Sequence, residues 1–127
     1  MALAHIQYDA AGRLREAGLF KPCASRAYYA AFAASHAILL KLGHSTPRED
    51  QGTWNHKTLP AAFVNDLQRT GKVREKWRLQ QISRDLSRLR QYREIADYLP
   101  GWSLDAQTAG LRLSDAKSIL RLAEQLI

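Results

Sequence analysis

The 127-residue sequence predicts an all-α fold, an up-and-down bundle of four to five helices. Apolar residues recur at spacings of three and four along most of the chain, which is the pattern of helices that bury one face. No segment shows the apolar–polar alternation that is typical of a half-buried strand. A chain of this length is expected to fold around one core, so we predict a single domain over residues 1–127.

The first two helices are predicted at residues 2–17 and 22–42. Gly18 stands where a left-handed cap would end the first helix, and Gly43 has the same place after the second, which carries Pro22 in its first turn. The second helix is apolar on nearly all sides, which indicates a central position. The apolar stripe of the first helix consists of Leu3, Ile6, Ala10, Leu14 and Ala17.

Residues 43–57 mix glycine, proline, charged and small polar residues without periodicity, and we interpret them as a loop in which Trp54 serves as an apolar anchor. Thr58 is expected to cap a short third helix that ends near Gly71. No proline or glycine interrupts residues 73–99, so one long fourth helix is predicted there. Its buried seam would contain Leu79, Ile82, Leu86, Leu89, Arg93 and Ala96.

Pro100 and Gly101 end the fourth helix, and Ser103 is expected to cap the last one. The last helix runs to the end of the sequence, and small and aliphatic residues form its seam: Ala106, Ala109, Leu113, Ala116, Leu120, Ala123 and Ile127.

The formal net charge of +7 is concentrated in residues 69–93, which hold nine basic and two acidic residues. Such a segment favours a surface that attracts polyanions, although its arginines could instead pair with acids elsewhere on a solvated face. No stretch is long and apolar enough for a membrane span, and the N-terminal residues lack signal-peptide features. We therefore expect a cytoplasmic protein. The lone cysteine, Cys23, excludes an internal disulfide.

Arg93 is the one charged residue on the apolar seam of the fourth helix. A buried guanidinium needs a partner, so Arg93 should pair with Asp97 or Glu94, or open onto a cleft or subunit interface that an anion can reach. Arg26 on the second helix lies near Tyr28 and Tyr29, which makes an aromatic and basic pocket for a nucleotide one interpretation. Ordinary core packing of the two tyrosines, with a hydroxyl tied to a helix, is the other.

Metal or cofactor chemistry has little support in the sequence. The histidines at 5, 36, 44 and 56 are scattered, and none has a second ligand at helical spacing. There is no glycine-rich phosphate loop and no nucleophile elbow. We expect no metal and no cofactor. His36 is interpreted as a satisfied interior histidine, and His56 as a capping or packing residue or as part of a site.

Three segments together carry a resemblance to a known family: SRAYYAAFAASHAILLKLG at 25–43, NHKTLPAAF at 55–63 and LRQYREIADY at 89–98. The chain resembles the HEPN domains, the higher-eukaryote and prokaryote nucleotide-binding helical domains, and is most similar to the small stand-alone prokaryotic members. The resemblance implies a helical bundle that commonly forms a homodimer. It also implies a toxin–antitoxin setting, in which the gene often lies beside that of a minimal nucleotidyltransferase.

Many HEPN proteins are metal-independent ribonucleases whose motif is an arginine followed a few residues later by a histidine. Arg93 matches that arginine, but Tyr98 fills the histidine position. A tyrosine with a pKa near 10 is a poor proton carrier at neutral pH. The resemblance therefore implies a dimeric RNA- or nucleotide-binding protein without efficient catalysis. Its catalytic positions would be Arg93 and Tyr98, and its binding residues Arg26, Tyr29, Arg88, Arg90, Arg93 and Asp97.

Two alternatives stay open. The chain could be a metal-independent endoribonuclease in which Arg93 acts with a substitute proton carrier such as His36 or His56. It could also be the interaction partner or substrate of a minimal nucleotidyltransferase, with Tyr98 or another exposed tyrosine accepting the nucleotidyl group.

Overall fold

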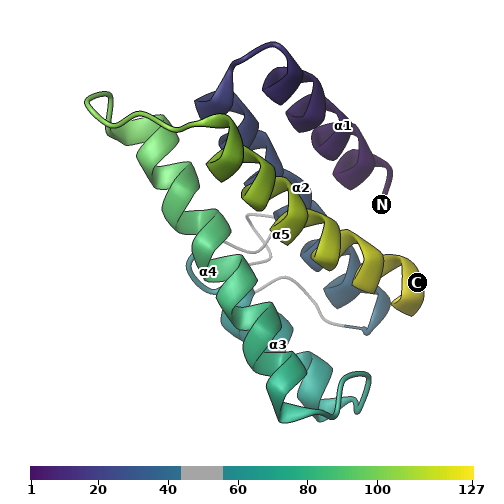
Figure 1. The fold of residues 1–127 in the computed structure, drawn as a ribbon. Helices are drawn as coiled ribbons and strands as arrows, with labels where there is room; N and C mark the ends of the chain where they lie inside the picture. Colours follow the sequence, from purple (N-terminus) through teal and green to yellow (C-terminus); the bar gives the residue numbers. More distant parts are fainter. Residues whose placement is uncertain (44–55) are drawn as a thin grey trace, which may run out of the picture.

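The computed structural model describes residues 1–43 and 56–127, and it is all-helical within them, which confirms the predicted fold class. Most of the loop predicted at 43–57, including His44 and Trp54, lies outside the described residues. The helices are α1 (Ala2–Glu16), α2 (Phe20–Lys41), α3 (Leu59–Arg69), α4 (Lys76–Tyr98) and α5 (Ala106–Leu126) (Figure 1).

Helix α2 is the centre of the bundle and packs against each of the other four helices, as its apolar sequence predicted. Helix α1 lies along α2 and α5, and the shorter α3 lies beside the first half of α4 (Figure 1). The α1–α2 and α4–α5 connections meet at one end of the bundle, where Lys21 Nζ donates a hydrogen bond of 2.9 Å to the Leu99 carbonyl. Among the described helices, none is long and apolar enough to cross a membrane.

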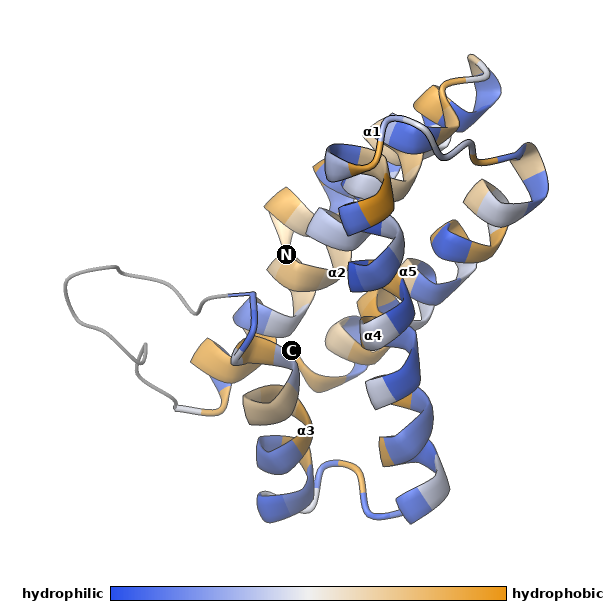
Figure 2. Ribbon diagram, turned by 90° about the vertical axis from the view of Figure 1, so that its left-hand side faces the viewer, coloured by the Kyte–Doolittle hydropathy of each residue, from blue (hydrophilic) through white to orange (hydrophobic). Residues whose placement is uncertain are grey.

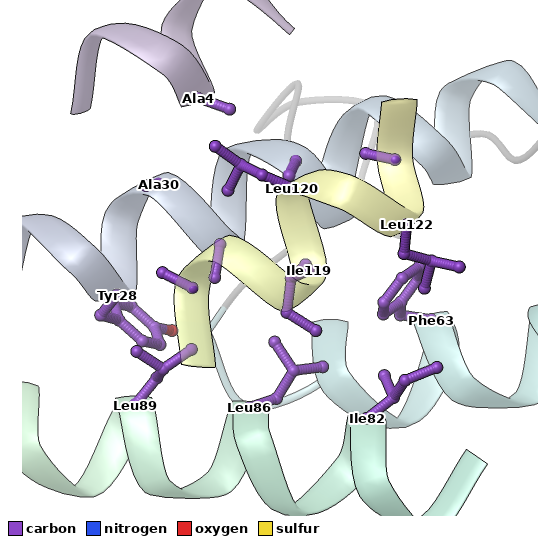
Figure 3. Packing of buried hydrophobic residues seen from close by; sticks show 14 of the residues in the cluster. Ala4, Tyr28, Ala30, Phe63, Ile82, Leu86, Leu89, Ile119, Leu120 and Leu122 are labelled. Carbon is purple, nitrogen blue, oxygen red and sulfur yellow. The ribbon is translucent and has the colours of Figure 1, made fainter. Parts of the chain in front are cut away.

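The predicted seam of α4 is confirmed at Leu79, Ile82, Leu86 and Leu89, which are all buried, whereas Ala96 near the end of the helix is half-buried. Ile82, Leu86 and Leu89 point from α4 toward α5, where Ile119 lies (Figure 3). Burying a side chain of this size contributes about 1.5–3 kcal/mol. The opposite face of α4 is strongly hydrophilic (Figure 2). This division fixes which residues of α4 face the other helices and which face solvent.

The apolar stripe predicted for α1 is wrong at both ends. Leu3, Ile6 and Ala17 are exposed, whereas Ala4 and Ala11 are fully buried against the core. Helix α1 packs on α2 and α5 through these small residues, which let the helices approach closely. The packing of α1 on α2 and α5 therefore buries the alanines, although the larger Leu3 and Ile6 give the more obvious apolar pattern in the sequence.

The helix ends agree with the prediction at Gly18 and Gly43, but the start of α4 and the cap of α5 differ from it. Gly18 and Gly43 have φ angles of 78° and 88°, in the left-handed region where glycine has no Cβ penalty. Helix α4 begins at Lys76 and not at 73, because Val73 is buried and its N–H bonds to the end of α3. Helix α5 is capped not by Ser103 but by Asp105, whose carboxylate accepts a 2.7 Å hydrogen bond from the Thr108 N–H.

Candidate functional site

Arg93 lies near the end of α4 and points toward α2, with its side chain only 13% exposed. Three tyrosine rings surround its guanidinium. The centroids of the Tyr28, Tyr29 and Tyr98 rings lie 5.5, 5.7 and 5.5 Å from the guanidinium carbon. Tyr28 and Tyr29 lie on α2, and Tyr98 is the last residue of α4. Ring faces attract a cation at these distances, so the three tyrosines stabilise the charged guanidinium in this position.

Asp97 is the carboxylate partner of Arg93, as one of the sequence-based alternatives predicted. Its Oδ2 lies 3.3 Å from Arg93 Nε, but this Nε is buried and makes no hydrogen bond. The guanidinium does donate through Nη2 to Tyr29 Oη over 3.4 Å. A guanidinium has five N–H donors, so most of its hydrogen-bonding capacity is not used within the described residues.

His56, just before α3, is part of the same cluster. Its Nδ1 lies 2.6 Å from Tyr28 Oη, and its ring packs on Phe32 with the centroids 4.4 Å apart. Burial lowers the pKa of His56, and the charges of Arg93 and Arg90 lower it further. Burial also raises the pKa of Tyr28 to about 12. At neutral pH the histidine is therefore neutral and the phenol protonated, and the tautomer of His56 decides whether Tyr28 donates to Nδ1 or accepts from Nδ1–H.

The cluster corrects two expectations about these aromatic residues. Tyr28 packs in the core as expected, but its hydroxyl is bonded to His56 and not to a helix. His36 is not a satisfied interior histidine, because its Nε2 is buried with no hydrogen-bond partner among the described residues. It lies in a hollow between α1 and α2 beside Phe32 and Leu40.

A hollow of about 320 Å³ opens between the start of α2 and the end of α4. Its lining includes Lys21, Arg26, Tyr29 and Asp97. Arg93 does not line it, but two residues that do, Tyr29 and Asp97, are the hydrogen-bond and ion-pair partners of Arg93. Arg26 donates through Nη1 to the Gln7 side chain over 3.1 Å. Neither Lys21 nor Arg26 forms an ion pair with a carboxylate in the described part of the chain. The hollow therefore has an excess of positive charge even with Asp97 at its edge. We name this feature the Arg93 hollow.

Two other predicted binding residues lie on α4 before Arg93. Arg90 forms an ion pair with Glu94 over 3.3 Å and lies close enough to His56 to lower the pKa of its ring. Arg88 is on another side of the helix, since five residues correspond to a rotation of about 140° from Arg93. It pairs there with Asp85 and Asp115 at 2.6 and 3.2 Å. The structure thus brings Arg90, but not Arg88, to the cluster.

Within the described part of the chain, the basic segment 69–93 contains both paired and unpaired cations. Arg69, Arg88, Arg90 and Arg93 each pair with a carboxylate. By contrast, Lys72, Arg74 and Lys76 around the start of α4 form no ion pair with any described carboxylate. The structure therefore confirms paired arginines in one part of the segment, and a polyanion-attracting surface stays a prediction for the other part.

Arg112, an arginine on α5 that is buried in the structure, was not singled out from the sequence. Its Nε bonds to Asp115 over 2.9 Å, and its guanidinium carbon lies 4.2 Å from the Tyr92 ring centroid. The signal was available, because Arg112 lies at helical spacing between Ala109 and Ala116. These contacts stabilise the α4–α5 packing and leave Arg112 outside the cluster.

Nothing within residues 1–43 and 56–127 brings three His, Cys, Asp or Glu side chains together as metal ligands would be. In a comparison with protein-family models, residues 3–127 match the model described as HEPN domain. No match was found among curated proteins.

Proposed function

Because the chain belongs to the HEPN domain family, we propose that it binds RNA or a nucleotide through the cluster around Arg93. This family is generally associated with ribonuclease or nucleotide-related functions. One observation carries the proposal: Arg93 is an almost buried guanidinium with unused donors, next to a hollow lined by Lys21 and Arg26. A planar guanidinium matches the geometry of a phosphate and can bind two of its oxygens.

The contact with Asp97 is compatible with this role. It is an ion pair without a hydrogen bond, at a carboxylate side chain that is one-third exposed. Because Nε makes no hydrogen bond to Asp97, the guanidinium keeps donors available for a ligand. The tyrosine rings keep Arg93 in place before the ligand arrives, which reduces the entropy lost on binding.

The test is a titration of fluorescently labelled single-stranded RNA with the wild type and with Arg93→Ala. Charge-assisted hydrogen bonds contribute about 1.5–3 kcal/mol, so we expect the affinity to fall by about 10- to 100-fold. Arg84→Ala is the matched control, because Arg84 is exposed on the same helix and, within residues 1–43 and 56–127, bonds to the neutral Gln81 and to no carboxylate. Equal losses for the two variants would contradict binding at the cluster.

A second candidate function is metal-independent cleavage of RNA, and the position of His56 favours it. In the tautomer whose Nδ1–H donates to Tyr28 Oη, Nε2 of a neutral His56 takes the proton of a ribose 2′-hydroxyl. The 2′-oxygen attacks the adjacent phosphorus and expels the 5′-oxygen of the next nucleotide. The products are a 2′,3′-cyclic phosphate and a 5′-hydroxyl, which receives a proton from solvent or from the protonated histidine. Arg93 stabilises the charge that develops on the phosphate.

Cleavage in EDTA tests this candidate. Replacing a proton-transfer residue costs about 10²- to 10⁴-fold in rate, so His56→Gln should lose most activity while still binding RNA. Tyr98→Phe should cleave like the wild type, because it keeps the ring beside Arg93. Binding without cleavage by the wild type would leave the binding function alone.

The remaining family-based expectations are proposals of the same kind. Tyr98 is 65% exposed, so a partner nucleotidyltransferase could reach its hydroxyl and modify it. A homodimer and a toxin–antitoxin pair are likewise proposed from the family. Sedimentation of the purified chain tests the homodimer. Incubation with the product of a neighbouring nucleotidyltransferase gene, followed by mass spectrometry of Tyr98, tests the pair and the modification.

A further inference from the structure

The connection between α4 and α5 exposes a large aromatic side chain, Trp102, which is 61% exposed. It borders a shallow hollow of about 310 Å³ whose lining includes Leu19, Lys21 and Pro22 from the start of α2. Tyr98 and Leu99 are also exposed at this end of the bundle. Exposing large apolar side chains to water costs free energy, and a group of them at one end of a protein marks a binding site for a ligand or another protein.

The Trp102 hollow adjoins the Arg93 hollow. Lys21 and Pro22 line both. The connection is held in position here, because Lys21 Nζ bonds to the Leu99 carbonyl just before Trp102. The ammonium group has three N–H donors, so this bond leaves two for a ligand. An apolar platform and a cationic hollow are thus joined by one shared lysine.

This pairing matches the chemistry of a nucleotide. A base has an apolar face that stacks on an exposed aromatic ring, while its phosphate needs cations such as Lys21, Arg26 and Arg93. A protein partner or a second copy of the chain would bury the indole as well. Neither explains why Lys21, with two unused donors, lies beside the indole and also lines the neighbouring cationic hollow. Charge and apolar surface together therefore favour a nucleotide.

We propose that Trp102 is a stacking platform for the base of a nucleotide whose phosphate lies in the Arg93 hollow, either free or within single-stranded RNA. This inference rests on the proposed function and extends it. A base can stack on Trp102 only if it is unpaired, so the site selects single strands and discriminates weakly among sequences.

Tryptophan fluorescence tests the proposal directly, since the sequence has three tryptophans, at 54, 77 and 102. A variant with Trp54→Phe and Trp77→Phe reports on Trp102 alone. Its matched control carries Trp54→Phe and Trp102→Phe and reports on Trp77. Trp77 is 67% exposed but stands at the other end of α4, about 30 Å away.

The probes are AMP and a single-stranded hexaadenylate. We expect quenching of Trp102 and no change at Trp77. Quenching by both probes identifies a site for free nucleotides, and quenching by the hexamer alone identifies single-stranded RNA as the source. No quenching of Trp102 by either probe, or equal quenching of Trp77, would overturn the proposal.

Affinities separate this inference from the function on which it rests. Stacking of one base predicts that Trp102→Ala weakens hexamer binding by about 5- to 100-fold, whereas Trp102→Phe keeps most of the affinity. Loss of binding in Arg93→Ala but not in Trp102→Ala would refute the stacking role and leave the proposed function intact. No binding by the wild type would refute both. A Trp102→Ala variant that changes only the sedimentation coefficient would assign the indole to a subunit contact instead.

Discussion

Arg112 offers the sharpest test of how the α4–α5 contact is stabilised. Its side chain is 7% exposed, and it bonds to Asp115, which also meets Arg88. Arg112→Met removes the charge but keeps an unbranched apolar chain of similar length, so packing changes little. The variant therefore isolates the electrostatic contribution of one buried cation.

The magnitude follows from the two contacts of the guanidinium. The 2.9 Å hydrogen bond to the Asp115 carboxylate contributes about 1.5–3 kcal/mol. The contact with the Tyr92 ring, at 4.2 Å from its centroid, adds about 1–2 kcal/mol. Arg88 stays 3.2 Å from Asp115 and keeps that carboxylate partly compensated. We expect the free energy of unfolding to fall by about 2–4 kcal/mol.

Urea unfolding followed by far-UV circular dichroism measures this loss. With a denaturant slope of about 1–3 kcal/mol per molar, the midpoint should move down by about 1–2 M at an unchanged slope. Arg121→Met on the exposed side of the same helix is the control and should shift the midpoint little. Equal shifts for the two variants would show that the buried ion pair contributes nothing beyond the loss of an arginine.

Two further predictions concern other parts of the bundle. A Cβ on Gly110 would lie 2.9 Å from Arg15 Nη2. Replacing a helical glycine by alanine stabilises by about 1 kcal/mol, so we expect Gly110→Ala to give this full gain only in an Arg15→Ala background. Urea unfolding measures the gain, and equal gains in the wild-type and Arg15→Ala backgrounds would refute the prediction. Burial lowers the pKa of His36 and His56, so the unfolded chain binds protons at a higher pH than the folded one, and stability should decrease as the pH falls below about 6.5. Urea midpoints at pH 7.5 and 5.5 measure this decrease, and a variant with both histidines replaced by Gln should show a smaller one; equal decreases would contradict the assignment.

The fold could be predicted from the sequence wherever local signals were strong. Gly18 and Gly43 marked helix ends, and the uninterrupted stretch before Pro100 predicted one long helix. The choice of the buried face of α1 could not be predicted, because it depends on how closely α1 approaches α2 and α5. Exposed Ile6 and buried Ala4 are both apolar, and only the tertiary contact distinguishes them.

The candidate site was predictable in part. Arg93 stood out as a charge on an apolar seam, and Asp97 one turn later was one of its two possible acidic partners. The approach of His56 to Tyr28 was not predictable, since the two residues are 28 positions apart and no periodicity connects them. Likewise, helical spacing does not show that Lys21 links the Arg93 hollow to Trp102, because this depends on where two connections meet.

A crystal structure of the protein with a 2′-O-methylated RNA trinucleotide tests the central claim most directly, because the modification blocks cleavage and keeps the ligand intact. We predict a phosphate within hydrogen-bond distance of the Arg93 guanidinium. A trinucleotide bound only around Lys72, Arg74 and Lys76 at the other end of α4, with Arg93 still on Asp97 and Tyr29, would contradict the account.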